Sequence, residues 1–304
     1  MHATLVHNAT AGTGRPTTEE LVELLEAADI SATPHSPKDK NLARVLARAS
    51  GLVIAAGGDG TIAKVITLLK DREAKVAILP LGTANNIARS FGITGPVEEI
   101  VAGWHHGGEK HLDIGTAEGP FERRRFLEAV GIGALADITS RKIPEDGTLA
   151  KQVERGRDAF RRALRKAKPF KAKLTLDDRP FKQEVLLVEI MNIGFVGPNL
   201  RLTQADPGDG RFDVVYVPAE AQRGMLEWME EPERRVAPVE VEQARRITFR
   251  RDGGTLRVGD KAIPEGEGEV VIEMEHPPVN ILLPSAPVKQ KKVVSPGNDE
   301  KTEV

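Results

Sequence analysis

The chain has 304 residues, of which 40% are hydrophobic and 29% charged, and its formal net charge is −2. This length accommodates one large domain or two modest ones around a real apolar core, and this charge balance argues against wholesale nucleic-acid binding. The sequence has no cysteine, which excludes disulfides and thiolate metal sites. We expect neither a signal peptide nor a transmembrane helix, and therefore a cytoplasmic location.

The first part of the chain, to about residue 110, alternates strand and helix patterns. This succession predicts right-handed crossovers and a doubly wound, mostly parallel sheet with helices on both faces. Ligands of such sheets bind at the carboxyl ends of the strands. The predicted strands are residues 3–7, 52–56 and 75–80, and the predicted helices are 17–25, 41–49, 62–69 and 87–91.

The later part of the chain consists of short runs rich in β-branched residues, separated by turn sequences. This pattern predicts an antiparallel β-sandwich, interrupted by a helix at about 149–168. The fold class is therefore α/β, with an α/β domain over 1–116 and a β-rich domain over 117–278. We expect 279–284 to return to the first domain as an extra strand, and the polar segment 285–304 to be disordered. The predicted strands of this part are 126–130, 173–176, 185–191, 212–217, 247–249 and 270–272.

The turn at 57–61, Gly-Gly-Asp-Gly-Thr, joins a predicted buried strand to a predicted helix. Three glycines in four positions let a bulky ligand approach the backbone. The free amides of the turn and the dipole of the helix favour an anion, most often phosphate. A carboxylate at Asp59 fits such a site when a divalent cation or a hydroxyl proton lies between it and the phosphate. The alternative is local: Asp59 forms an Asx turn and Thr61 caps the helix.

Two more loops, 8–12 and 81–86, are predicted at the same sheet edge. Together the three loops resemble the nucleotide site of the diacylglycerol kinase catalytic domain family, which includes bacterial lipid kinases and sphingosine kinases. The most specific part is the turn at 57–61, followed about twenty residues later by Leu-Pro-Leu-Gly-Thr-Ala-Asn at 79–85. Residues 126–133 and 206–213 are also similar to that family.

The resemblance implies two domains, with ATP bound in the cleft between a nucleotide-binding domain and a substrate domain. It implies a kinase that uses ATP and Mg²⁺ to phosphorylate a lipid hydroxyl group, such as that of diacylglycerol, with Asp59 as a catalytic residue that helps to hold phosphate and magnesium-linked water. It also implies that Asp113 lies near the metal network and that Asp209 belongs to a second, structural magnesium loop; both are also common turn residues. The implied nucleotide-binding residues are Asn8, Thr10, Gly12, Ser36, Gly57, Gly58, Asp59, Gly60, Thr61, Thr83 and Asn85.

Two positions depart from the family pattern. An aspartate-glycine-glutamate turn is expected where this chain has Gly259-Asp260-Lys261, so Lys261 replaces the glutamate that would accept a proton. Asp260 can serve as the catalytic base if the turn is shifted by one residue, and Glu265 is close in sequence. Asn86 stands where the family usually has aspartate. Two alternatives therefore stay open: a catalytically weak nucleotide- or lipid-binding relative that acts as a sensor or scaffold, and an NAD kinase.

The segment Arg141 to Lys173 is markedly basic and carries an apolar stripe at helical spacing that includes Phe160 and Leu164. Such a helix can lie on an anionic membrane, where a lipid kinase meets its substrate. The alternative is a solvated helix whose stripe packs on its own domain. We expect no nucleic-acid binding, because aromatic residues are not interleaved with the basic ones. The histidines at 105–111 fit no zinc pattern. Whether the chain forms a homo-oligomer is left open.

Overall fold

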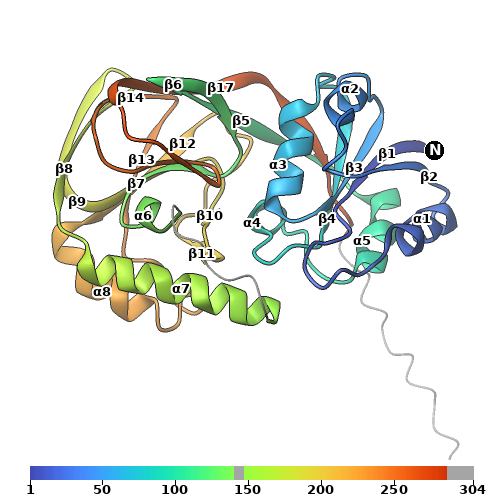
Figure 1. Cartoon of the computed structure of the whole chain (residues 1–304), viewed down its shortest axis with the longest axis horizontal. Helices are drawn as coiled ribbons and strands as arrows, with labels where there is room; N and C mark the ends of the chain where they lie inside the picture. The colour runs from blue at the N-terminus through green and yellow to red at the C-terminus, as the bar shows by residue number, and fades with distance from the viewer. Residues whose placement is uncertain (140–146, 286–304) are drawn as a thin grey trace, which may run out of the picture.

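The computed structural model describes residues 1–139 and 147–285. These residues form two lobes (Figure 1), and each lobe has its own apolar core. The combination of a parallel N-terminal sheet with antiparallel strands in the C-terminal lobe confirms the predicted fold class. The predicted tail lies outside the described residues from residue 286 on, as does the part of the predicted basic segment at 141–146.

The N-terminal lobe is a parallel sheet in the order β2-β1-β3-β4-β17. Helix α1 contacts α5, and α2 contacts α3, so the helices form separate layers. The strands and helices of this lobe are β1 (His2–His7), α1 (Thr18–Ala27), β2 (Ser31–His35), α2 (Leu42–Leu46), β3 (Leu52–Gly57), α3 (Asp59–Leu68), β4 (Lys75–Pro80), α4 (Asn86–Ser90), α5 (Val97–Gly103) and η1 (Trp104–His106).

Local sequence explains several of these elements. Every residue of β3 is buried, because a parallel strand covered on both faces needs an apolar run rather than an alternating one. Helix α1 begins with a capping box, in which Thr17 accepts the N–H of Glu20 and Glu20 accepts the N–H of Thr17. Strand β2 is absent from the predicted elements, because its polar, half-exposed sequence carries no strand pattern and it forms only by pairing with β1.

The C-terminal lobe is mainly antiparallel. Its strands bend around one apolar core, and a second core lies under the helices α6, α7 and α8. The elements are β5 (Glu109–Gly119), β6 (Phe121–Phe126), β7 (Ala129–Gly133), α6 (Ala136–Thr139), α7 (Leu149–Lys166), β8 (Phe170–Leu176), β9 (Arg179–Met191), β10 (Phe195–Val196), β11 (Leu200–Arg201), β12 (Phe212–Pro218), η2 (Ala219–Ala221), α8 (Gln222–Trp228), β13 (Glu240–Ala244), β14 (Arg246–Asp252), β15 (Leu256–Val258), β16 (Lys261–Ile263) and β17 (Glu267–Leu282).

Helix α7 lies along one side of the C-terminal lobe (Figure 1). Phe160 and Leu164 are fully buried in the second core, so the apolar stripe packs on its own lobe, as the alternative interpretation expected. Within 1–139 and 147–285, no helix combines the length and apolar character needed to cross a membrane. The exposed basic residues at and after the end of α7 are Arg162, Arg165, Lys166 and Lys168.

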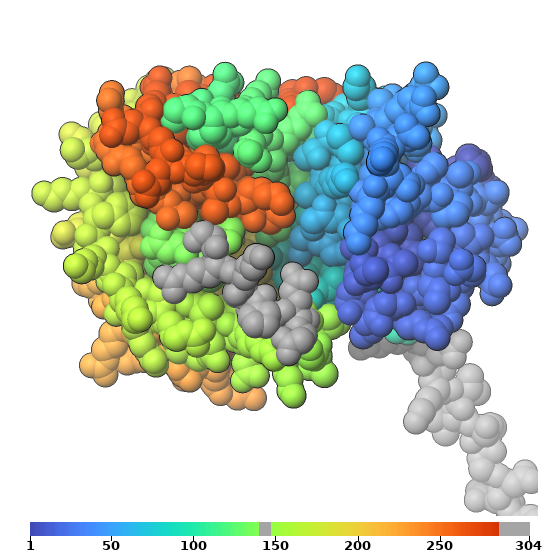
Figure 2. All heavy atoms as spheres, in the orientation of Figure 1, coloured from blue at the N-terminus to red at the C-terminus, as the bar shows by residue number. Residues whose placement is uncertain are grey.

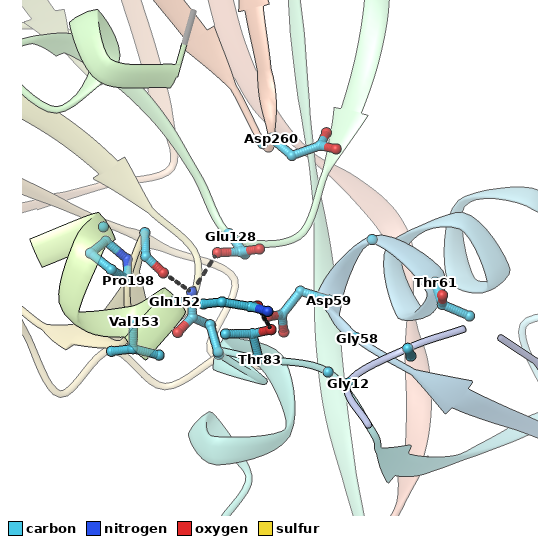
Figure 3. A pocket seen from close by; sticks show the side chains of 18 of the residues that line it. Gly12, Gly58, Asp59, Thr61, Thr83, Glu128, Gln152, Val153, Pro198 and Asp260 are labelled. Carbon is cyan, nitrogen blue, oxygen red and sulfur yellow. Dashed lines mark hydrogen bonds between the residues drawn. The ribbon is translucent and has the colours of Figure 1, made fainter. Parts of the chain in front are cut away.

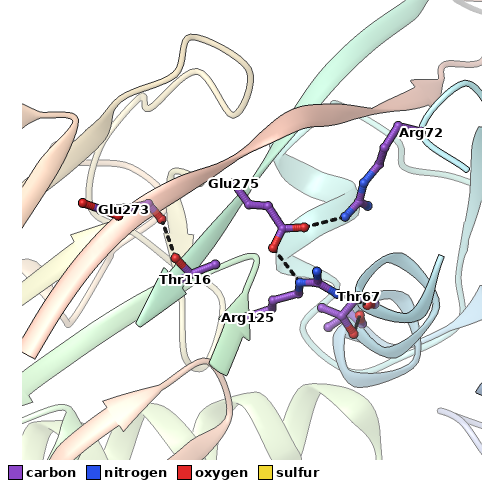
Figure 4. Close-up of polar contacts among 7 residues, drawn as sticks. Thr67, Arg72, Thr116, Arg125, Glu273 and Glu275 are labelled. Carbon is purple, nitrogen blue, oxygen red and sulfur yellow. Dashed lines mark hydrogen bonds and ion pairs between the residues drawn. The ribbon is translucent and has the colours of Figure 1, made fainter. Parts of the chain in front are cut away.

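Strands β5 and β17 run side by side through both lobes. The first part of β17 pairs with β14, and its end pairs in parallel with β4. Between these parts, Glu275 joins the lobes (Figure 4): Oε1 accepts a hydrogen bond from Arg72 Nη2 at 2.7 Å, and Oε2 accepts one from Arg125 Nε at 2.7 Å. Arg125 also donates to the carbonyl of Thr67 at the end of α3. A charged clamp therefore holds the N-terminal lobe against β6 and β17.

Candidate active site

A cleft with a volume of about 1380 Å³ lies where the two lobes meet (Figures 2 and 3). The N-terminal lobe contributes the loops after β1, β3 and β4, together with Pro37 and Lys38 from the loop after β2, at the carboxyl edge of its parallel sheet. The C-terminal lobe contributes α6, α7 and three turns, between β6 and β7, β10 and β11, and β15 and β16. Sites for one small molecule measure about 300–1,000 Å³, so this cleft has room for two ligands.

Glycines bring the three N-terminal loops into backbone contact. A Cβ atom on Gly82 would lie 2.3 Å from Cα of Gly58, and a Cβ on Gly12 would lie 2.2 Å from the carbonyl oxygen of Leu81. Gly12 also has a φ of +58°, a conformation that favours glycine. Asn8 orders the first loop, because its Oδ1 accepts hydrogen bonds from the N–H and the hydroxyl of Thr10. The predicted meeting of these loops at one edge is thus found in the structure.

The start of α3 forms the floor of the cleft on this side. Gly58 is the N-cap and offers no side-chain cap, so the first amides of the helix are left for a ligand. Thr61 lies inside the first turn and its side chain is against Gly57, so the interpretation of Thr61 as a helix cap is wrong. Lys38 and Lys64 line the same side. Helix amides and two lysines together make this part of the cleft suited to phosphate groups.

Asp59 lines the cleft and also binds the neighbouring loop. Its Oδ1 accepts the N–H of Ile87 in the first turn of α4 at 2.9 Å, so the carboxylate reaches across to α4 instead of forming an Asx turn of its own. Burial raises the pKa of Asp59, and the hydrogen bonds from the backbone of Ile87 and Asn86 oppose that rise. Asp59 therefore fixes the third loop against the second.

Glu128 faces Asp59 from the turn between β6 and β7 (Figure 3). Its Oε2 accepts a hydrogen bond from Asn86 Nδ2 at 3.0 Å, and the same amide donates to the carbonyl of Gly197 at 3.0 Å. Burial raises the pKa of Glu128 to about 8, and the charge of Asp59 adds to that rise. The family pattern has an aspartate at position 86. In this chain Asn86 stands there and donates a hydrogen bond to Glu128, an acid from the opposite lobe.

The sequence interpretation missed Glu128 because it treated 126–130 as one strand, which is wrong. The structure breaks the run after Phe126 and resumes it at Ala129. Asn192 holds this break: its side chain donates to the carbonyl of Leu127, and its backbone N–H donates to the carbonyl of Glu128. The sequence did contain one signal: Glu128 is a charged residue within an apolar run, and a carboxylate is rarely buried in a strand without a partner.

The hairpin of β15 and β16 carries Asp260 to the rim of the cleft. Gly259 has a φ of +59°, as the tight turn requires. Arg257 supports the hairpin from below, because it forms a buried ion pair with Glu189 and donates to the carbonyl of Gly259 at 2.6 Å. The Nζ atom of Lys261 lies 3.5 Å from Oδ2 of Asp260. Lys261 is not among the residues that line the cleft.

The opposite wall of the cleft is largely apolar. It is lined by Leu135 and Ile138 near α6, Val153 on α7 and Pro198 between β10 and β11. Thr83, on the loop after β4, donates a hydrogen bond to Gln152 of α7 at 2.8 Å and so joins the two walls. A ligand in the cleft would therefore meet polar groups on one side and an apolar surface on the other.

Three predicted nucleotide-binding residues lie outside the cleft lining. Ser36 orders its own loop, where its hydroxyl accepts the N–H of Lys38. Gly57 ends β3 and lies against the Thr61 side chain. Asn85 has a φ of +53° and stabilises its turn: its Oδ1 accepts the N–H of Gly82 at 2.9 Å. The predicted residues that do line the cleft are Asn8, Thr10, Gly12, Gly58, Asp59, Gly60, Thr61, Thr83 and Asp260.

Asp113 and Asp209, the two predicted metal residues, come together away from the cleft lining. Asp113 on β5 accepts the N–H of Gly210 at 2.7 Å, and Asp209 accepts the N–H of Arg211 at 2.8 Å. Burial raises the pKa of both carboxyl groups, and the nearby charge of Asp206 adds to the rise in each. Among the residues described, no group of three or more His, Asp or Glu side chains is arranged to hold a metal ion.

The residues present fit ATP and magnesium in different degrees. The open start of α3, Lys38 and Lys64 fit a polyphosphate, and the apolar wall fits a nucleotide base or an acyl chain. Mg²⁺ prefers oxygen ligands and is usually held by one or two carboxylates together with substrate phosphates. The carboxylates of Asp59 and Glu128 provide that chemistry, and the buried Oδ1 of Asn86 has no partner in the described structure.

Comparison with known proteins gives a consistent result. Residues 2–117 match the family model of the diacylglycerol kinase catalytic domain. Diacylglycerol kinase of Bacillus subtilis (strain 168) is 29% identical over 175 residues, which cover 55% of this chain and 54% of that enzyme. The chain thus spans about half the length of the curated relatives that it matches.

Two solved structures show the same fold. A diacylglycerol kinase from Bacillus anthracis str. Sterne aligns with a TM-score of 0.68 at 18% identity, covering 93% of this chain and 96% of that one. An NAD kinase from Archaeoglobus fulgidus in complex with ATP aligns with a TM-score of 0.53 at 14% identity, covering 93% of each chain. At these identities the likeness concerns the fold alone.

Proposed function

We propose that this chain transfers the γ-phosphoryl group of ATP to a hydroxyl group of a lipid such as diacylglycerol, because residues 2–117 match the family model of the diacylglycerol kinase catalytic domain. The observation that carries this proposal is the cleft itself. Glycine loops, lysines and the open start of α3 form one wall, apolar residues form the other, and the carboxylates of Asp59 and Glu128 lie between them. We assign nucleotide binding to residues 1–116 and acceptor binding to 117–278.

ATP phosphates would bind along the three N-terminal loops. Thr10 and Gly12 would contact them from the loop after β1, and Gly60 and Lys64 from α3. Phosphoryl transfer depends mainly on positioning and on neutralising charge. The amides and lysines of this wall supply both, and Thr83 would contact the nucleotide where its loop meets α7.

Magnesium, when bound with the nucleotide, would neutralise the phosphate oxygens near Asp59. The carboxylate of Asp59 is held by the N–H of Ile87 in α4, which orients it beside the proposed phosphate site. Asp113 and Asp209 lie together beside β5, and for them we propose a structural role in joining β5 to the loop between β11 and β12.

The acceptor hydroxyl group would enter from the C-terminal lobe, where Asp260 faces the cleft. We propose that Asp260 assists the loss of the hydroxyl proton, an effect of about 10²–10⁴-fold for a well-placed catalytic base. Asp260→Asn should then lower turnover without weakening ATP binding. Equal turnover of the variant and the parent protein would exclude Asp260 from this role.

A kinase assay with labelled ATP tests the proposed function. The acceptors are diacylglycerol, phosphatidylglycerol, sphingosine and NAD, and we expect transfer to a lipid. Asp59→Ala should abolish it. ATP binding without transfer to any acceptor would favour the sensor or scaffold alternative, and transfer to NAD alone would favour an NAD kinase.

For access to the lipid we propose peripheral contact with the anionic inner face of the membrane. The apolar stripe of α7 is buried, so this contact would be electrostatic, through the exposed Arg162, Arg165, Lys166 and Lys168. Sedimentation with liposomes, with and without anionic lipid, tests it. Equal binding to neutral and anionic liposomes would contradict the electrostatic contact.

A further inference from the structure

We infer that Arg257 and Glu189 are a positioning pair for phosphoryl transfer, because they hold the turn that carries Asp260 at the cleft. The inference rests on the proposed kinase function, in which Asp260 is the catalytic base. The turn joins β15 and β16, which have three residues each, and β16 is the last strand of the sheet. Hairpins this short are marginally stable alone. The side chain of Asp260 is 69% exposed, so its position depends on the backbone of the turn.

The pair is built into the register of three neighbouring strands. Gly131 on β7 pairs with Arg257 on β15 on one side and with Glu189 on β9 on the other. A Cβ atom on Gly131 would lie 2.8 Å from Cδ of Glu189, so the absence of a side chain makes the space in which the carboxylate lies. Arg257 reaches across this glycine, and its Nη2 donates a hydrogen bond to Oε2 of Glu189. The ion pair therefore joins two strands that are not adjacent.

The tip of the hairpin is held through both backbone groups of Gly259. Its carbonyl accepts a hydrogen bond from Nη1 of Arg257 at 2.6 Å, and its N–H donates to the carbonyl of Ala129 at 2.9 Å. Ala129 directly follows Glu128, so the tip is fixed beside the turn that carries Glu128. Because Asp260 is the next residue after Gly259, a loss of the guanidinium would release the backbone that places Asp260.

Stability alone does not explain this ion pair. Arg257 is 5% exposed and Glu189 is fully buried. Within the described structure, Nε of Arg257 and Oε1 of Glu189 have no hydrogen-bond partner. The removal of two charges from water is repaid only when all their hydrogen bonds are satisfied, and apolar residues of similar volume often stabilise a protein equally well. The place of Arg257 in the lining of the cleft assigns the pair to the geometry of the site.

The first test is the double variant Arg257→Met, Glu189→Leu, which replaces the ion pair with apolar residues. We expect the free energy of unfolding in urea to stay at or above the parent value. Turnover should fall by about 10²-fold, the cost of a misplacement of about 1 Å, while the Kd of ATP stays within about threefold. Arg246→Met is the matched control, because Arg246 forms an exposed ion pair with Glu273 and should leave turnover unchanged. A folded double variant with parental turnover would overturn the inference.

The second test separates positioning from packing and uses Arg257→Lys, which keeps the charge and serves also if the double variant unfolds. A lysine lacks the planar fork that reaches Glu189 and Gly259 together. If Arg257 acts through Asp260, the two losses are not additive. Arg257→Lys should lower turnover by about tenfold in the parent protein and by less than about threefold in an Asp260→Asn background. Equal factors in the two backgrounds would overturn the positioning role.

Amide hydrogen exchange, followed by mass spectrometry, tests the held turn without an activity measurement. The N–H of Gly259 should exchange slowly in the parent protein and faster in both variants, whereas the exchange of β12 should not change. Unchanged exchange of the turn in both variants would overturn the inference. A parent protein that phosphorylates no acceptor would overturn the proposed function and the link to transfer, while faster exchange in the variants would still show that the pair holds the turn.

Discussion

Glu275→Gln tests whether the clamp between the lobes stabilises the whole molecule. The side chains of Arg72 and Glu275 are 13% and 15% exposed, so this pair is largely withdrawn from water, whereas Arg125 is 43% exposed. A hydrogen bond to a charged group contributes about 1.5–3 kcal/mol, and an exposed pair about 0.2–1 kcal/mol. Removal of the charge should therefore lower the free energy of unfolding by about 2–3 kcal/mol.

Urea denaturation measures this loss, and the two tryptophans report on the lobes separately. Trp104 lies in the core of the N-terminal lobe and Trp228 in the second core of the C-terminal lobe. Fluorescence of Trp104→Phe and Trp228→Phe backgrounds should show the loss with either reporter. The matched control is Glu273→Gln, because Glu273 lies on β17 as Glu275 does and also pairs with an arginine, Arg246. The side chains of Glu273 and Arg246 are 49% and 55% exposed. A loss no larger than that of the control would refute the clamp.

Three further predictions concern the loops, the pH dependence and the second core. Gly82→Ala should abolish ATP binding, because its Cβ would lie 2.3 Å from Cα of Gly58, whereas Gly108→Ala, which meets nothing within 4 Å, should bind normally by calorimetry. The folded-state pKa of Glu128, about 8, lies above its ordinary value of 4.5, so the parent protein should lose stability as pH rises through this window. Between about pH 5 and about pH 8.5, urea titrations should show a smaller loss of unfolding free energy in Glu128→Gln than in the parent protein. An equal loss in both proteins would contradict the raised pKa of Glu128. Phe160→Ala should lower the free energy of unfolding by about 3–5 kcal/mol, and a loss below about 1 kcal/mol would contradict its burial in the core.

The sequence predicted the polar half of the cleft well. Glycine turns and buried parallel strands are local signals, and the carboxyl ends of such strands must meet at one edge, so the neighbourhood of Gly12, Gly58 and Gly82 followed from pattern alone. The prediction was incomplete where side chains come from the other lobe. Glu128 follows β6 in the chain, and its contact with Asn86 joins the two lobes. The periodicity of a sequence carries no information about such a long-range contact.

Roles of single residues were harder to predict than their location. Asn85 and Gly57 are part of the motif, yet their contacts in the structure are with their own turns. The place of Lys38 and Lys64 in the cleft lining could not be predicted, because neither belongs to a motif and lysines are common on exposed loops and helices. Asp113 and Asp209 were predicted as metal residues only through the resemblance, and their proximity to each other depends on long-range packing.

The path of β17 has a consequence for how the protein is made. Its last residues, 280–282, supply the strand next to β4, so the sheet that begins at residue 2 is completed by residues near the far end of the sequence. During synthesis on the ribosome, the N-terminal lobe would wait with one edge of its sheet open until β17 emerges. A fragment of residues 1–116 produced alone would keep that edge open, so biochemical work on the nucleotide site should use a chain that extends through Leu282.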